Sequence, residues 1–184
     1  SSVTGRVRVD GADPQDPAAT PGRHAAYLGP QPELHPRKPL GRQLMASLDA
    51  AGYDRRDAER RTGALLRAVG LGGAHATHPQ RMGVLERHRA ALALALTPGA
   101  RVVVADRVGE ESDTFVRAEL RALLREARDY LDLAIVHLTQ DVGGVADLAD
   151  RVVVLDGGRV VEDAPVRGFF SAPSGPLAKS LIAA

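Results

Sequence analysis

His78-Pro79-Gln80-Arg81-Met82-Gly83-Val84-Leu85-Glu86-Arg87-His88-Arg89 is the stretch that decides the expected fold. An apolar helical pattern follows it and leads into Arg101-Val102-Val103-Val104-Ala105-Asp106, a short apolar run that ends in an acid. Apolar runs of this length are typical of strands that are buried on both faces, in a parallel sheet covered by helices. The order of helix, buried strand and acidic residue therefore predicts an α/β fold.

The rest of the chain has strand patterns at both ends and helical patterns in the middle. Short β-type runs occur at residues 5–9, 25–28, 133–138, 151–155 and 158–161, and Gly157-Gly158 predicts a hairpin turn between the last two. Leu40, Leu44 and Leu48 recur at helical spacing within residues 34–96, where no strand pattern occurs. We therefore expect a single domain over residues 1–184, with an α/β core at 1–33 and 97–184 that includes the C-terminal hairpin, and a helical lobe at 34–96.

Composition excludes several classes of function. The 184 residues are 44% hydrophobic and carry a net charge of +1, which suits one well-buried domain. No apolar run approaches the roughly 20 residues that cross a bilayer, so we expect no direct membrane insertion. The chain has no cysteine, which excludes disulfides and cysteine-bound zinc, and its basic residues alternate with acids, which predicts no nucleic-acid binding.

In order and spacing, these elements resemble the ATP-binding-cassette (ABC) ATPases, above all the ATP-binding subunits of oligopeptide, dipeptide and nickel importers. Residues 78–89 stand where that family has Tyr-Pro-x-x-Leu-Ser-Gly-Gly-Gln-x-Gln-Arg, and Tyr27-Leu28-Gly29-Pro30-Gln31-Pro32 stands at its Q-loop. Segments 150–162 and 169–184 are similar to the end of a peptide-importer cassette. The resemblance covers essentially the whole chain and implies a P-loop NTPase-like sheet with an inserted helical lobe.

The resemblance also implies which residues face a ligand. Those facing nucleotide are Gln31, Gly83, Asp113 and Gln140, and the one facing magnesium is Asp106. If the Q-loop is anchored on Pro32, Pro30 takes the glutamine position, and a shift by one residue restores Gln31. Asp113 is also interpreted as the N-cap of the helix that follows it, and Asp106 as an ordinary aspartate at a strand end.

Most reactive groups of that family are replaced in this chain. The catalytic glutamate position is Arg107, whose guanidinium cannot accept a proton at physiological pH, and the switch histidine position is Gln140. The signature serine and its two glycines are Gly83, Val84 and Leu85. The sequence contains no Gly-rich phosphate loop followed by Lys and Ser or Thr, so we expect the N-terminal P-loop portion to be absent and no catalytic residue to be intact.

The histidines offer a different kind of site. His75, His78 and His88 have a possible metal-ligand spacing, but no carboxylate joins them, and the neighbouring glycines and proline indicate a loop. His137 lies inside an apolar strand and is interpreted as an interior or strand-edge histidine instead of a general base.

Three functions follow from these patterns. We favour a degenerate, non-hydrolysing ABC ATP-binding-type domain of a peptide-type transporter, which serves as a docking or dimerisation subunit and is not an enzyme. The alternative is a fragment of a divergent importer ATPase whose P-loop lies upstream of residue 1, and only this alternative implies ATP and Mg as cofactors. A small-molecule-binding α/β domain ranks below both, because no Gly-x-Gly-x-x-Gly fingerprint opens a helix after a strand.

The favoured function implies partners and a location. The partners are membrane permease subunits and a second cassette subunit or domain, with the permease contacting residues 31–44 and the lobe as far as Arg81. The chain is then expected in the cytoplasm, peripheral at the inner face of the cell membrane.

Overall fold

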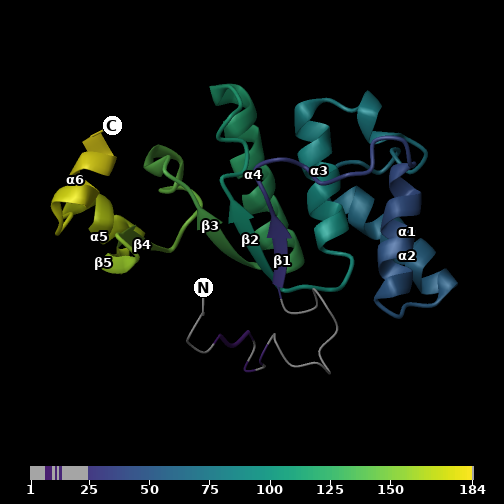
Figure 1. Ribbon diagram of the computed structural model, residues 1–184, viewed down its shortest axis with the longest axis horizontal. Helices are drawn as coiled ribbons and strands as arrows, with labels where there is room; N and C mark the ends of the chain where they lie inside the picture. The colour runs from purple at the N-terminus through teal and green to yellow at the C-terminus, as the bar shows by residue number, and fades with distance from the viewer. Residues whose placement is uncertain (1–6, 10, 12, 14–24, 184) are drawn as a thin grey trace. The chain divides into compact units, whose positions relative to one another are not determined.

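The computed structural model describes residues 7–9, 11, 13 and 25–183. Residues 5 and 6 of the strand expected at 5–9 lie outside the described residues. The chain divides into two compact units, Ser1–Leu138 and Thr139–Ala184. In Figure 1 the elements of the first unit run from purple to green, and those of the second unit from green to yellow.

Three parallel strands form the sheet of the first unit. β1 (Ala25–Leu28), β2 (Val102–Asp106) and β3 (Ala134–Leu138) lie in the order β1-β2-β3 (Figure 1). β2 is the middle strand, and its Val104 lies opposite Tyr27 of β1 and Val136 of β3. The predicted parallel sheet is confirmed.

Helices fill the sequence between the strands. They are α1 (Leu40–Ala50), α2 (Arg55–Ala68), the short 3-10 helix η1 (Pro79–Arg81), α3 (Val84–Ala95) and α4 (Thr114–Leu131). Leu40, Leu44 and Leu48 of α1 have no exposed surface, as their helical spacing predicts. The assignment of α1, α2 and α3 to a separate lobe at residues 34–96 stays a prediction.

Aspartates begin two of these helices. The Asp54 carboxylate accepts a hydrogen bond from the Asp57 N–H at 2.9 Å, and the Asp113 carboxylate accepts one from the Val116 N–H at 2.9 Å. Each bond satisfies one of the N–H groups that lack a partner in the first turn of a helix. The N-cap interpretation of Asp113 is therefore confirmed.

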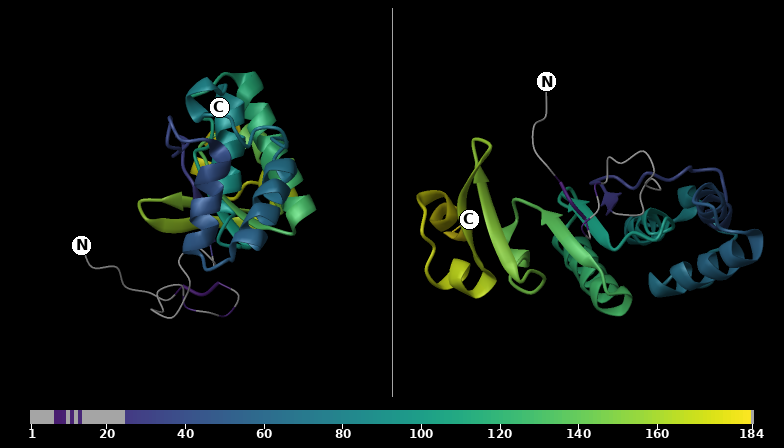
Figure 2. Two further views of the ribbon diagram at one scale, coloured as in Figure 1. Left: turned by 90° about the vertical axis from the view of Figure 1, so that its right-hand side faces the viewer. Right: turned by 90° about the horizontal axis from the view of Figure 1, so that it is seen from below.

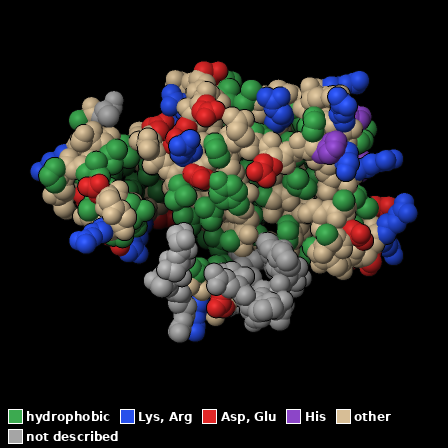
Figure 3. All heavy atoms as spheres, in the orientation of Figure 1, with side chains coloured by type: hydrophobic (Ala, Val, Ile, Leu, Met, Phe, Trp, Pro, Cys, Tyr) green, Lys and Arg blue, Asp and Glu red, His purple; other side chains and the backbone are tan. Residues whose placement is uncertain are grey.

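The expectation that the strands are buried on both faces is wrong for this unit. Val103 and Ala105 of β2 are fully buried on the face that α3 and α4 cover, and the right-hand view of Figure 2 shows α4 along one side of the strands. On the other face Tyr27, Val136 and Leu138 expose 58%, 48% and 42% of their surface, and Figure 3 shows hydrophobic side chains there. An apolar run does not tell which of its alternating faces is covered, so the sequence pattern missed this open face.

The second unit is a β-hairpin packed on short helices. It contains η2 (Val142–Gly144), β4 (Arg151–Asp156), β5 (Arg159–Pro165), α5 (Val166–Ser171) and α6 (Pro176–Ala183). β4 and β5 are antiparallel, and Gly157 and Gly158 between them have φ of 53° and 78°. Positive φ at both central residues fits the turn that joins twisted strands, and it favours glycine. The predicted hairpin is confirmed.

The core of the second unit is small. Val154 of β4, Phe169 of α5 and Ala178 of α6 are buried together. The carboxylate of Glu162 is also buried, and it accepts hydrogen bonds from the Ser174 and Gly175 N–H groups at 3.1 and 3.2 Å. These bonds fasten the loop before α6 to β5.

In the described part of the chain, no helix is long and apolar enough to span a membrane.

Replacing Asp113 with Ala removes the acceptor for the Val116 N–H. We expect the free energy of unfolding to fall by about 1 kcal/mol, the usual contribution of an N-cap side chain. Asp113→Asn keeps an acceptor at the same place and is expected to lose much less. Urea denaturation followed by circular dichroism measures both variants, and equal losses would contradict the capping role.

Candidate functional site

The carboxyl ends of the parallel strands meet at one edge of the sheet, where ligands of open α/β sheets commonly bind. Gln31 lies in the loop after β1, and Asp106 and Arg107 lie at the end of β2. We call this group, together with Tyr27 of β1, the strand-end cluster. Gln140 belongs to the second unit, where its side chain is exposed.

Asp106 is bound by a tyrosine of the neighbouring strand. The Tyr27 hydroxyl donates a hydrogen bond to Asp106 Oδ2 at 2.8 Å. Both side chains lie on the open face, because Tyr27 pairs with Val104 and Asp106 follows two residues later. This hydrogen bond and, to a smaller extent, burial and the Asp106 charge raise the pKa of Tyr27 above its ordinary value of 10.0.

Gln31 connects the loops that follow β1 and β2. Its Nε2 donates a hydrogen bond to Glu111 Oε2 at 2.9 Å, and both side chains are exposed. The structure therefore places the predicted Gln31 beside an acid that the sequence patterns did not single out. The amide nitrogen of Gln31 is thus committed to Glu111.

Arg107 stands directly after β2 in an unusual backbone conformation. Its φ is 49°, in the left-handed region that non-glycine residues rarely adopt, and its N–H donates to the Leu138 carbonyl at 2.9 Å. The guanidinium Nε lies 3.7 Å from Glu110 Oε2. The ABC ATPases have a proton-accepting glutamate at this position. In this chain the position is held by a cation, Arg107, which is paired with Glu110.

The N-terminus of α3 is capped by the side chain of one of its own residues, Glu86. The Gly83 N–H donates a hydrogen bond to Glu86 Oε2 at 2.9 Å, an arrangement in which the third helical residue reaches back to the N-cap. Val84 follows with 42% of its surface exposed. An acidic side chain therefore lies at the positive end of the helix dipole, where an anion would otherwise be attracted.

A buried histidine joins α3 to the loop after β1. His88 is 3% exposed, and its Nδ1 and Nε2 lie 3.0 Å from the Val84 carbonyl and 3.4 Å from the Pro30 carbonyl. A neutral imidazole donates from only one nitrogen, so its tautomer decides which carbonyl receives the bond. Because His88 is committed to these backbone groups, it is a structural contact between α3 and the loop that carries Gln31.

The other histidines of the possible metal set do not join His88. In residues 7–9, 11, 13 and 25–183 no group of three or more His, Cys, Asp or Glu side chains is placed to hold a metal ion. The His75 ring instead covers Gly41, where an added Cβ would lie 2.4 Å from the ring atoms, and the His75 carbonyl accepts from the Gly41 N–H.

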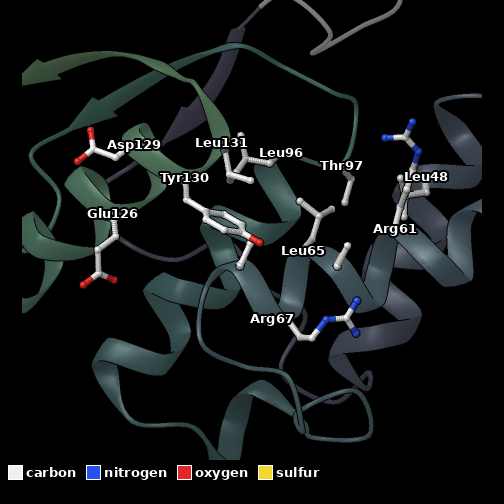
Figure 4. A pocket seen from close by; sticks show the side chains of 12 residues that line it. Leu48, Arg61, Leu65, Arg67, Leu96, Thr97, Glu126, Asp129, Tyr130 and Leu131 are labelled. Atoms are coloured by element: carbon white, nitrogen blue, oxygen red, sulfur yellow. The ribbon is translucent and has the colours of Figure 1, made fainter.

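A separate groove of about 850 Å³ lies between α2 and the end of α4 (Figure 4). Its apolar lining includes Leu48, Leu65, Leu96 and Leu131. Figure 4 shows the ring of Tyr130, which is 78% exposed, reaching from α4 toward α2.

The two sides of this groove carry opposite charges. Arg61 and Arg67 line it from α2, and Glu126 and Asp129 line it from α4 (Figure 4). Arg61 lies over the ring of Tyr53 at 4.2 Å from the centroid, a cation–π contact that holds the guanidinium on the α2 side. The groove is therefore apolar inside and polarised across its width.

Sequence reasoning missed Tyr27, Glu86 and Glu111 as parts of the site. The contact of Tyr27 with Asp106 depends on the register between β1 and β2, which no local pattern reveals. A signal existed for Glu86, since an acid three residues after an N-cap is the usual capping pattern. No pattern in the sequence indicated Glu111, whose role comes from a contact between two loops.

Replacing His88 tests its role as a structural contact. His88→Phe leaves the Pro30 carbonyl without this partner, and we expect the free energy of unfolding to fall by about 1–3 kcal/mol. His88→Gln keeps a donor and is expected to lose less than half of that amount. Thermal and urea denaturation measure both variants, and a phenylalanine variant as stable as the original chain would contradict the assignment.

Comparison with known proteins identifies the family of the chain. No protein-family model matches it. It is 32% identical over 185 residues to the nickel import ATP-binding protein NikD of Brucella abortus biovar 1 (strain 9-941), and the match covers 98% of this chain and 70% of that protein. It is 31% identical over 162 residues to a putative peptide import ATP-binding protein of Brucella abortus (strain 2308), covering 86% of this chain and 49% of the relative.

A glutathione import ATP-binding protein, GsiA of Pectobacterium atrosepticum, is 31% identical over 162 residues, covering 86% of this chain and 26% of that protein. The chain thus spans about half the length, 49%, of the peptide-import relatives. The match to NikD extends over nearly the whole chain and over more than two thirds of the relative. On this evidence, the chain belongs to the ATP-binding proteins of ABC importers.

Proposed function

We propose that the chain is a docking and dimerisation component of a peptide-type ABC importer that does not hydrolyse ATP. The observation that carries this proposal is Arg107, a cation paired with Glu110 directly after Asp106, where the family has its catalytic glutamate. The relatives named as peptide, glutathione and nickel import proteins support the transporter context.

The chemistry of phosphoryl transfer explains why one residue weighs so much. Such reactions depend on placing charges and a proton acceptor around the phosphate, and there is little covalent chemistry for the protein to perform. A guanidinium stays protonated at physiological pH and cannot take a proton from the attacking water. Loss of one such group commonly costs about 2–4 kcal/mol of transition-state stabilisation.

The docking part of the proposal rests on the groove beside α2. An apolar groove with cationic and acidic sides suits a short amphipathic helix, whose apolar face fills the groove. Its acidic residues would face Arg61 and Arg67, and its basic residues would face Glu126, since Asp129 is already paired with Arg128 at 2.8 Å. We assign this helix to the membrane permease, and the groove extends the expected docking surface at residues 31–81 onto the end of α4.

Turnover is the first test. With magnesium and ATP present, we expect phosphate release by the purified chain to equal that of a buffer control. Arg107→Glu restores an acid at the family position. We expect phosphate release by this variant to stay at background, because Glu86 still bonds the Gly83 N–H at the start of α3 and Tyr27 still bonds Asp106. Release by the original chain at a rate well above background would contradict the proposal.

Capture of the permease is the second test. Ala64 is an exposed groove residue, so Ala64→Glu places a charge in the groove with little effect on folding. We expect it to weaken co-purification with the permease at least tenfold, or about 1.4 kcal/mol. The matched control is Ala118→Glu on an exposed position near the start of α4, which neither lines the groove nor belongs to residues 31–81.

Affinity purification of the tagged chain from native membranes in mild detergent provides the measurement. Recovery of permease by the original chain and the Ala118→Glu control, with loss in the groove variant, is the expected result. Failure of the original chain to recover any permease, or equal recovery by all three, would contradict docking through this groove.

A further inference from the structure

Two neighbouring segments of the first unit carry positive charge without any acid. Residues 34–48 and 70–85 contain no Asp or Glu, although the chain as a whole is nearly balanced, with 24 Lys and Arg against 23 Asp and Glu. Basic residues alternate with acids over most of the sequence, but not in these segments. Their four Arg and Lys side chains are all exposed, and we call them the cationic patch: Arg37, Lys38, Arg42 and Arg81.

The two segments are joined where α1 begins. The Leu40 N–H donates to the Thr77 carbonyl at 2.8 Å, and the Gln80 N–H donates to the Pro36 carbonyl at 3.3 Å. In the upper right of Figure 3, Lys, Arg and His side chains gather over the end of α1 at which these loops lie in Figure 1. The cationic patch is therefore one surface built from two loops.

The turn that carries Arg37 and Lys38 is fixed by Gln43. The Gln43 Nε2 donates to the His35 and Lys38 carbonyls at 3.0 and 2.8 Å, and its Oε1 accepts from the His35 N–H at 2.9 Å. These bonds satisfy backbone groups of the turn, while the Arg37 and Lys38 side chains stay exposed. A partner that binds these side chains thus does not have to order the backbone that presents them.

No acid of the described ranges balances this charge. Across residues 7–9, 11, 13 and 25–183, no ion pair joins a side chain of the cationic patch to an acid. Glu33 and Glu86 flank the two segments, and Glu86 is already bonded to the Gly83 N–H at 2.9 Å. The four charges are therefore available to an external anion.

The patch also lies at the end of α1 where cations are least favourable. The N-terminus of a helix is the positive end of its dipole, and α1 has no acid in its first turn. Lys38 lies just before this N-terminus, and Arg42 lies within the first turn. An arrangement that breaks a local rule without a compensating contact is typical of a functional surface. An anion outside the chain would remove the repulsion.

We propose that the cationic patch binds the anionic phospholipid headgroups of a membrane surface. A surface cluster of about four to eight Lys and Arg is attracted to anionic lipids, and each side chain adds to the attraction. Side chains spread over two loops suit a plane of many headgroups. The chain belongs to the ATP-binding proteins of ABC importers, so a bilayer lies within its reach. None of the four side chains lines the groove beside α2, so lipid contact and permease docking are separate properties.

Vesicle binding tests the proposal with the purified full chain alone. Vesicles of equal parts phosphatidylcholine and phosphatidylglycerol provide the anionic surface, and phosphatidylcholine vesicles are the neutral control. We expect the chain to sediment with the anionic vesicles only. Raising salt from about 0.1 M to about 1 M shortens the screening length from about 10 to about 3 Å and should release the chain. No binding to the anionic vesicles, or equal binding to both kinds, would overturn the proposal.

Matched double variants show whether the patch itself is responsible. Arg37→Gln with Lys38→Gln removes two of its charges, and at about fivefold for each basic side chain we expect binding to weaken about 25-fold. The control, Arg55→Gln with Arg56→Gln, removes the same charge at the start of α2, which follows the other end of α1. The 11 residues of α1 span about 16 Å, which exceeds the screening length, so we expect the control to bind like the original chain. Equal losses in both variants would show a response to net charge alone and overturn the proposal.

Arg42 separates lipid binding from a structural role. Arg42→Gln removes a cation from the positive end of the α1 dipole, so we expect vesicle binding to fall about fivefold while Tm stays the same or rises. A lower Tm would show that Arg42 has a stabilising partner within the chain, which contradicts a patch kept for an external anion.

Other partners of the patch are recognised with the Arg37 and Lys38 double variant. If it binds anionic vesicles like the original chain but no longer recovers permease, the patch contacts acidic residues of the permease. If it loses binding to a random-sequence DNA duplex but not to vesicles, the partner is nucleic acid. Either result would overturn the lipid assignment. Loss of vesicle binding with unchanged permease recovery supports it and leaves docking through the groove standing.

Discussion

The pairing of β2 with a strand on each side is the constraint on which the rest of the first unit depends. Val104 lies opposite both Tyr27 and Val136, so the side chains of three distant segments share one face of the sheet. Because side chains alternate along a strand, a shift of one residue would send Tyr27 to the helix-covered face and separate it from Asp106. The register therefore fixes the fold and the chemistry of the strand-end cluster together.

The loops at this edge are held by contacts within the protein. Gln31 is bound to Glu111, the Arg107 N–H to the Leu138 carbonyl, and His88 lies between α3 and the loop after β1. These three groups at the edge of the sheet therefore already have partners in the chain. A site whose polar groups are satisfied internally gains little from a bound nucleotide, which fits a subunit that acts through its surfaces.

Much of the fold was predictable because local rules decide it. The aspartates at positions 54 and 113, the spacing of leucines in α1, and the two glycines of the hairpin each follow from hydrogen bonding or backbone conformation within a few residues. The open face of β3 was not predictable, because an apolar run reads the same whether one or both of its faces are covered. Among the site residues, Asp106 and Arg107 were found from a motif. The contacts of Tyr27 and Glu111 join residues that are 79 and 80 positions apart in the sequence, so they leave no local pattern.

The central claim is that the ligand-facing groups of this chain are occupied by the chain itself. The most direct measurement is an amide nitrogen–proton NMR spectrum of the full chain, recorded while magnesium and ATP are added at millimolar concentration. The account predicts that the Gly83 and Arg107 amide signals stay in place, because Glu86 and the Leu138 carbonyl keep these groups. Saturable shifts of both signals would show that a nucleotide displaces the internal partners, and would contradict the account.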